Sequence, residues 1–133
     1  MTIKLIEIPK IHEIRGNLSV IEGDIIPFKM ERIYYLYDVP SGAERGGHAH
    51  KNIQQFMLAL SGSFDVILNN GKEEKTITLN KPNVGLLIEN GMWRELKNFS
   101  SGSVCLVIAS AVYDEADYIR DFDEFMLFKN GIS

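Results

Sequence analysis

Short segments in which apolar and polar residues alternate, separated by turn residues, make up most of this chain. Alternation at every second position puts one face of a segment in a core and the other in solvent, which is typical of β-strands. Asn69-Asn70-Gly71 is a strong hairpin signal between two such segments. The pattern predicts about nine or ten strands in all. The clearest fall at residues 1–9, 17–22, 32–39, 54–60, 63–68, 75–79, 84–88, 93–97 and 103–110.

The last part of the chain has a different pattern. Tyr118, Phe122, Phe125 and Met126 recur at helical spacing, which predicts one short amphipathic helix within residues 114–128. The acids of this segment are interpreted as a solvated helix face; they are Asp114, Glu115, Asp117, Asp121, Asp123 and Glu124. Many strands and one terminal helix favour an all-β sandwich or jelly roll. Without a repeat or linker, the sequence predicts a single domain over residues 1–133.

The composition is that of a globular protein with an acidic balance. Of 133 residues, 45% are hydrophobic and 24% charged, and the formal net charge is −4. This balance argues against nucleic acid as a partner, because nonspecific binding needs a basic surface. The one cysteine, Cys105, lies in an apolar run and is expected in the core without a disulfide partner. No segment has the pattern of a membrane span or a signal peptide, so we expect no membrane association and a cytoplasmic location.

Two of the three histidines, His48 and His50, stand two residues apart in a segment expected to be extended. Their side chains would leave the same face of a strand, roughly 6–7 Å apart. Two imidazoles on one pocket wall can hold a metal ion or transfer protons. The residues around the two histidines help to decide between metal binding and proton transfer.

The histidines belong to a glycine-framed pattern, Gly42-x5-His48-x-His50-x4-Gln55-x6-Gly62. It resembles the first motif of cupins, and the segment around Arg94 resembles the second. The resemblance implies a cupin-type jelly roll (a double-stranded β-helix), in which metal-binding members have a glutamate at the Gln55 position and a histidine at the Arg94 position. Arginine stays protonated and cannot ligate a metal, and its charge would repel a divalent ion by roughly several kcal/mol. We therefore expect no metal and interpret the histidines as proton-transfer groups.

Further segments narrow the resemblance. They are Arg32-Ile-Tyr-Tyr35, Arg45-Gly-Gly-His-Ala-His-Lys51, Val84-Gly-Leu86, Trp93-Arg-Glu-Leu96 and residues 109–120. In order and spacing they resemble the dTDP-sugar 3,4-ketoisomerases over residues 11–125. The resemblance implies an enzyme that converts dTDP-4-keto-6-deoxy-D-glucose to a 3-keto-6-deoxyhexose, ahead of transamination to a 3-amino sugar, without a cofactor. It also implies a homodimer whose N-terminal strands pack on, or exchange with, the partner subunit.

Four candidate residues would act on the reacting sugar. The carbonyl moves from C4 to C3 through an enediol, and His48 and His50 are expected to share the acid and base steps, because imidazole titrates near neutrality. Arg94 is expected to point into the pocket, where it would stabilise the enediolate or orient the hexose. Gln55 is expected to hydrogen-bond one of the histidines and fix its tautomer.

The other candidates would bind the rest of the substrate. Arg45 is expected to bind the diphosphate, because a guanidinium matches its oxygens, and Lys51 is either a second diphosphate contact or a solvated lysine. Tyr35 and Tyr37 share one strand face and would hydrogen-bond the sugar or stack on thymine. Arg15 would lie at the pocket mouth or on the surface.

Three other functions fit parts of the sequence: a 3,5-epimerase of similar substrates, a metal-dependent cupin such as a dioxygenase, and a non-catalytic sugar-nucleotide-binding module. The His-x-His pair together with Trp93-Arg94 resembles the ketoisomerases better. The configuration at C4 of the product is a further question, because Arg15 resembles the galacto-forming members and Arg94 the gluco-forming ones. From Arg15 we predict a 3-keto-6-deoxygalactose product.

Overall fold

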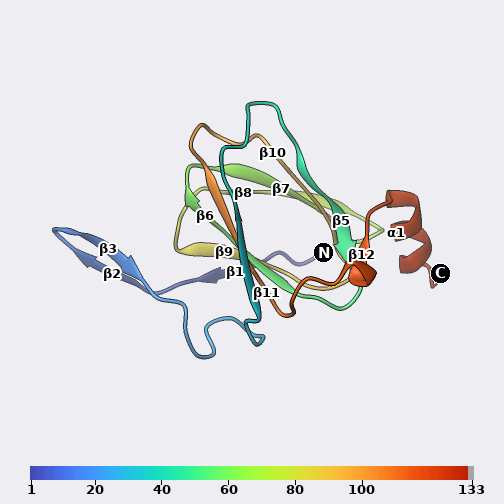
Figure 1. Cartoon of the computed structure of the whole chain (residues 1–133), viewed down its shortest axis with the longest axis horizontal. Coiled ribbons are helices and arrows are strands. Elements are labelled where there is room, and N and C mark those ends of the chain that lie inside the picture. Colours follow the sequence, from blue (N-terminus) through green and yellow to red (C-terminus); the bar gives the residue numbers. More distant parts are fainter. Residues whose placement is uncertain (132–133) are drawn as a thin grey trace.

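The computed structural model describes residues 1–131, which form two facing antiparallel sheets of five strands and a separate two-stranded hairpin (Figure 1). One sheet has the order β1 (Lys4–Glu7), β9 (Val84–Ile88), β6 (Gln55–Ser61), β11 (Val104–Ala109), β4 (Arg32–Leu36). The other has the order β12 (Tyr118–Ile119), β5 (Arg45–His50), β10 (Trp93–Lys97), β7 (Phe64–Asn69), β8 (Glu74–Leu79). Most neighbours in each sheet are distant in the chain, which is the arrangement of a jelly roll. The all-β prediction is confirmed.

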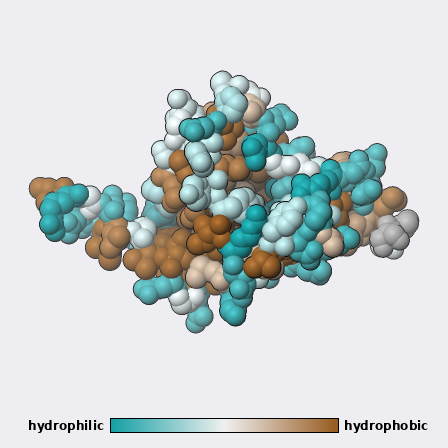
Figure 2. Space-filling model, in the orientation of Figure 1, coloured by the Kyte–Doolittle hydropathy of each residue, from teal (hydrophilic) through white to brown (hydrophobic). Residues whose placement is uncertain are grey.

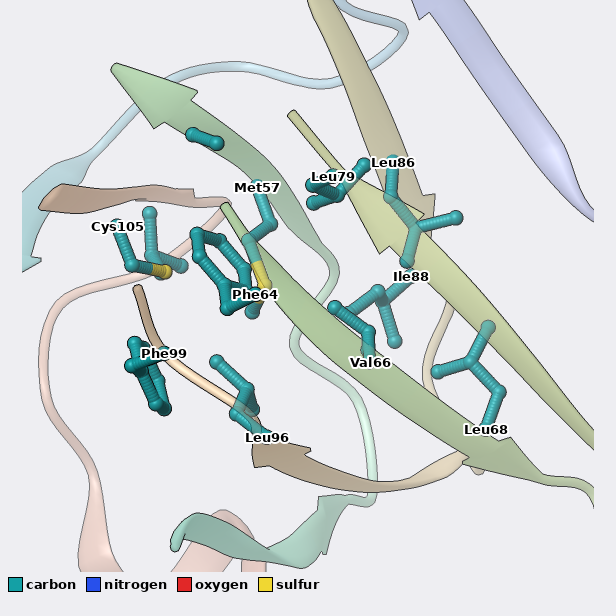
Figure 3. Close-up of a cluster of buried hydrophobic side chains, with 12 residues drawn as sticks. Met57, Phe64, Val66, Leu68, Leu79, Leu86, Ile88, Leu96, Phe99 and Cys105 are labelled. Atoms are coloured by element: carbon teal, nitrogen blue, oxygen red, sulfur yellow. The ribbon is translucent and has the colours of Figure 1, made fainter. Parts of the chain in front are cut away.

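The core lies between the two sheets and follows from alternation along the strands. Phe64, Val66 and Leu68 of β7 are buried, whereas the residues between them are partly exposed. They pack against Leu86 and Ile88 of β9, as Figure 3 shows. Burying each such side chain stabilises the fold by about 1.5–3 kcal/mol. Cys105 belongs to this cluster as a free thiol, as predicted.

The hairpin of β2 (Lys10–Glu13) and β3 (Gly16–Ser19) extends away from the sheets in Figure 1. Every residue of its two strands is exposed, including Ile11 and Leu18. An isolated hairpin of this kind is marginally stable in water. Its apolar side chains are therefore available to a surface outside this chain.

The predicted short C-terminal helix is present, but it begins only after residue 121. The structure has a 3₁₀ turn at Glu115–Asp117, then β12, and a helix, α1 (Phe122–Lys129), that begins after the Asp121 N-cap. The helical prediction for 114–121 is wrong because β12 pairs with β5, placing Tyr118 opposite His50. Asp117 is consequently buried, with 5% of its surface exposed, rather than part of a solvated face. No helix in residues 1–131 has the length and apolar character needed to span a membrane.

Candidate active site

A cavity of about 290 Å³ opens between the two sheets. Its floor includes the apolar side chains of Leu36, Met57 and Leu96. Its polar lining comes from strands of both sheets and from the segment after β12: Arg32, Tyr34, Arg45, His48, Gln55, Arg94, Tyr118 and Arg120. Four of these eight are arginines, in a chain whose net charge is −4. The cavity is therefore suited to an anionic ligand.

Gly46 of β5 allows β10 to approach closely next to Arg94. Gly46 has φ +83°, and a side chain there would lie 3.0 Å from Leu96 Cδ1 and 3.1 Å from the Arg94 carbonyl oxygen. The pairing of β5 with β10 has a register shift next to this point, and Arg94 is opposite His48. Residues opposite each other on neighbouring strands share a face. The Arg94 and His48 side chains thus enter the cavity side by side.

His48 lines the cavity, and His50 lies behind it, 1% exposed. The two ring centroids are 5.0 Å apart and the rings are nearly perpendicular, at 89°. Tyr118 of β12 is 5.0 Å from the ring of His48 and 4.4 Å from that of His50. The Nε2 atoms of both histidines are buried and have no hydrogen-bond partner within the described chain. Sequence reasoning correctly placed the histidines on one face, but it missed Tyr118.

His50 is held by Asp117, a second residue that sequence reasoning missed. The Nδ1 atom of His50 lies 3.0 Å from Asp117 Oδ2. The same carboxylate accepts hydrogen bonds from the backbone N–H groups of Asn52 (2.8 Å) and Ile53 (3.2 Å). A carboxylate bonded to the second nitrogen of a histidine orients the ring and selects its tautomer.

Arg94 is 1% exposed and is bonded to neutral oxygens. Its Nη1 donates to Gln55 Oε1 (2.5 Å), while Nε and Nη2 donate to the Met92 carbonyl oxygen (3.3 and 3.1 Å). Gln55 Nε2 in turn donates to the Tyr34 hydroxyl (3.2 Å). The prediction that Gln55 bonds a histidine is therefore wrong, because the amide is already shared between Tyr34 and Arg94. The position of Arg94 inside the cavity was predicted correctly.

Burial and the Arg94 charge keep both imidazoles neutral. Desolvation, then Arg94, then His50 lower the pKa of His48 to about 3. Desolvation and Arg94 lower the pKa of His50 to about 4, although Asp117 acts in the opposite direction. Burial lowers the pKa of Arg94 itself to about 10, so it remains a cation at neutral pH. The site thus combines two neutral bases with one fixed positive charge.

Three more arginines surround the cavity. Arg120 is bonded to Glu115 (2.7 and 2.8 Å) and lies over the ring of Tyr118, 4.2 Å from its centroid. Arg32 lies over Tyr34 at 4.6 Å. Arg45 lines the cavity beside Gly46. Guanidinium groups held by stacking are well placed to bind phosphate oxygens.

Four predicted site residues do not line this cavity. Arg15 is on the hairpin, with 84% of its side chain exposed and bonded to Glu13. Tyr35 of β4 and Tyr37, just beyond its end, are 59% and 60% exposed. Lys51 is exposed beyond the end of β5. The structure brings together five of the nine predicted residues: His48, His50, Gln55, Arg45 and Arg94.

The fold and the site together define a class: cupin-type β-proteins with an arginine-lined cavity next to paired histidines. The chain matches the family described as "FdtA: WxcM-like, C-terminal" over residues 1–130, and it belongs to that family. It is 45% identical, over 92% of its length and 88% of the relative's, to a TDP-4-oxo-6-deoxy-alpha-D-glucose-3,4-oxoisomerase of Aneurinibacillus thermoaerophilus.

Solved structures agree with this family. A 3,4-ketoisomerase from Helicobacter canadensis superposes with a TM-score of 0.94 at 44% identity, covering 98% of both chains. A histidine-to-asparagine variant of the 3,4-ketoisomerase QdtA from Thermoanaerobacterium thermosaccharolyticum, in complex with TDP-4-keto-6-deoxyglucose, gives 0.94 at 41% identity over 97% and 94%. A dTDP-4-dehydrorhamnose 3,5-epimerase from Bacillus anthracis, at 14% identity over 87% of this chain and 76% of its own, is similar in fold alone, with a TM-score of 0.77.

Proposed function

We propose that this chain is a sugar-nucleotide 3,4-ketoisomerase that acts on TDP-4-keto-6-deoxyglucose. The observation that carries the proposal is the pairing of neutral His48 with cationic Arg94 across β5 and β10, inside the cavity of a chain 45% identical to such an enzyme. A base beside a fixed positive charge is the arrangement that proton abstraction next to a carbonyl requires.

The reaction moves two hydrogens and no other atoms. The base removes the proton from C3, the C3–H electrons form a C3–C4 double bond, and the negative charge develops on the C4 oxygen. Return of a proton to C4, with transfer of the hydroxyl proton from O3 to O4, leaves a carbonyl at C3 and a hydroxyl at C4. We assign the direct contact with the hexose to His48, because it lines the cavity. His50, behind it, shares in the proton transfers.

Arg94 stabilises the charge that develops on the C4 oxygen. Its described hydrogen-bond partners, Gln55 and Met92, offer only neutral oxygens. The nearby Asp117 carboxylate acts on its charge without a direct hydrogen bond. The enediolate would be the first negative group in direct contact with it. Preorganised positive charge of this kind stabilises a transition state more than the neutral ground state.

The diphosphate is the natural ligand of the outer arginines. Arg45, Arg32 and Arg120 line the cavity and can approach its oxygens. The exposed Lys51 would need to bend toward the cavity from beyond the end of β5 to join them. Arg120 would exchange or share its bond to Glu115 with the ligand.

We further propose that the protein is a homodimer formed through its N-terminal strands. Exposed apolar side chains occupy the hairpin, β4 and the position just beyond its end, and include Ile11, Leu18, Ile33, Tyr35 and Tyr37. Figure 2 shows hydrophobic surface at the hairpin and where it joins the body. A surface of this kind on a projecting, exposed hairpin is typical of an interface. Tyr35 and Tyr37 would then act at the subunit contact. Sedimentation analysis of the wild type and of Leu18→Lys tests this.

The predicted galacto configuration depends on that dimer. Arg15 is on the projecting hairpin of its own chain, so it reaches a cavity only if the hairpin lies against a partner subunit. If Arg15 directs the proton to one face of C4 in this way, Arg15→Ala changes the ratio of C4 epimers without abolishing turnover. An unchanged ratio of epimers would show that Arg15 does not direct the proton. A gluco product from the wild type would show that Arg94, rather than Arg15, indicates the configuration at C4.

One incubation tests the function. The purified protein is mixed with TDP-4-keto-6-deoxyglucose and EDTA in deuterated water, and the hexose is followed by NMR. Ketoisomerisation moves the carbonyl carbon signal from C4 to C3 and places deuterium at C4. Inversion at C3 and C5 with the carbonyl unmoved would indicate an epimerase. Binding of the nucleotide without hydrogen exchange would indicate a non-catalytic module, and loss of turnover in EDTA would indicate a metal-dependent cupin. The cytoplasmic location stays a sequence-based prediction that cell fractionation tests.

A further inference from the structure

The Asp117 carboxylate is buried beneath the histidine pair and is bonded through both oxygens. Oδ1 accepts the N–H of Asn52 at 2.8 Å, and Oδ2 accepts that of Ile53 at 3.2 Å while it lies 3.0 Å from Nδ1 of His50. The Asp117 carbonyl oxygen accepts the N–H of Lys51 at 2.9 Å. Side chain and backbone thus anchor the same residue to the turn that follows β5. The carboxylate cannot turn away from His50 without breaking these bonds.

This anchoring determines which nitrogen of His50 carries the hydrogen. Both oxygens of Asp117 act as acceptors, so the nitrogen that faces them must be a donor. In a neutral imidazole, hydrogen on Nδ1 leaves Nε2 with a lone pair. That Nε2 is buried and has no partner within the described chain, in a ring 5.0 Å from His48. A buried acceptor without a partner is costly in a resting structure, and it is suited to receiving a proton.

We propose that Asp117 is a positioning residue for the isomerisation, which keeps His50 in the Nδ1–H tautomer so that its Nε2 can exchange protons with His48 or the hexose. The inference rests on the ketoisomerase function proposed above. When Nε2 takes a proton during turnover, the carboxylate also stabilises the resulting imidazolium. Asp117 itself touches no reacting atom.

Asp117→Asn tests the proposal, with Asp114→Asn as the matched control. Both variants remove one negative charge from the same turn. Asp114 only caps that turn, by accepting the N–H of Ala116 at 3.1 Å, and asparagine caps equally well. The amide at position 117 presents a donor to His50 or to the backbone, which disfavours the Nδ1–H tautomer. We expect kcat to fall by roughly 100-fold for Asp117→Asn. KM and TDP affinity should remain within about threefold of the control, because the arginines that bind the nucleotide are untouched.

A spectroscopic measurement separates positioning from a merely structural role. The chain has three histidines, so long-range proton–nitrogen spectra of protein labelled at histidine, assigned with His12→Gln and His48→Asn, identify the protonated nitrogen of each ring. Wild type is expected to show hydrogen on Nδ1 of His50, and Asp117→Asn to show it on Nε2. The protonated nitrogen can be identified even if the wild type has no isomerase activity. The spectra therefore test the tautomer of His50 independently of the proposed function.

Three results would overturn the inference. The first is a wild-type His50 with hydrogen on Nε2, which can be measured even if Asp117→Asn does not fold. The second is a folded Asp117→Asn whose kcat stays within about twofold of that of Asp114→Asn. A fall in kcat accompanied by an equal loss of TDP binding would also count against it, because that pattern indicates a distorted cavity.

Discussion

Replacing Arg94 with methionine should leave the fold at least as stable and remove most of the activity. The guanidinium is 1% exposed, and its partners are the neutral oxygens of Gln55 and Met92. Methionine has a similar length and no charge, so the variant removes the buried cation without opening a large cavity. Most substitutions of buried hydrogen-bonding residues do the opposite, because they destabilise the fold.

The magnitude follows from the cost of burying the charge. Burial lowers the pKa of Arg94 from 12.5 to about 10, a difference worth about 3.4 kcal/mol at roughly 1.36 kcal/mol per unit. Losing its hydrogen bonds leaves two oxygens without this donor, at about 1 kcal/mol each. The free energy of unfolding should therefore rise by about 1 kcal/mol, within a range of about 0–2. Loss of the oxyanion partner should lower kcat by roughly 10²–10³-fold.

Urea unfolding and steady-state kinetics measure both effects on the same samples. Arg94→Lys is the matched control, since it keeps the charge but not the fork of donors, and it should recover part of kcat without the gain in stability. The reasoning is refuted if Arg94→Met lowers the free energy of unfolding by more than about 2 kcal/mol and keeps kcat within tenfold of wild type. Arg94 would then be a structural residue whose charge is compensated in the free protein.

Three further predictions concern the histidines and the absence of a metal requirement. His48→Asn and His50→Asn should each lower kcat by at least about 10²-fold, with TDP affinity retained in a titration; turnover near the wild-type rate in both would contradict the relay. Because the pKa values of His48 and His50 are lowered to about 3 and 4, the unfolded chain binds more protons than the folded one below about pH 6.5. The free energy of unfolding is therefore not reduced by the histidines above that pH, and it falls toward pH 4 by up to about 1.4 kcal/mol per pH unit for each histidine. In urea titrations, a double His→Asn variant should show a weaker dependence of this free energy on pH. Dialysis against EDTA should leave kcat unchanged, and activity restored only by an added divalent metal would overturn the metal-free mechanism.

The two sheets could be predicted from sequence because alternation along a strand is a local signal. β7 reads in this way directly, with Phe64, Val66 and Leu68 buried on one face. β12 could not be predicted, because its two residues are extended only through pairing with β5. Helical spacing in residues 114–128 was a real local signal, but it was realised only from Phe122 onward. The structure of the residues before Phe122 was determined by pairing with β5, which is distant in the chain.

The same limit applies to the site. His48, Gln55 and Arg94 could be found because a spaced motif records their positions. In β4 both faces carry large side chains, so alternation did not decide whether Tyr34 or Tyr35 faces the cavity, and a shift of one residue exchanges the faces. Tyr34 is the one that lines it. Asp117 was read as solvated because it lies among other acids, and no sequence signal reveals that the turn folds back beneath His50.

Arg94 couples the pKa values of the two histidines to the charge of a bound ligand. With no ligand bound, burial and then Arg94 lower the pKa values of His48 and His50 to about 3 and 4, too low for an effective base near neutral pH. A bound diphosphate brings negative charge among Arg32, Arg45 and Arg120, and this charge opposes the effect of the arginines on both rings. On the proposed mechanism, the bound nucleotide would therefore raise the basicity available at C3. The free 4-keto-6-deoxyhexose, which lacks the diphosphate, should consequently lose kcat as well as affinity.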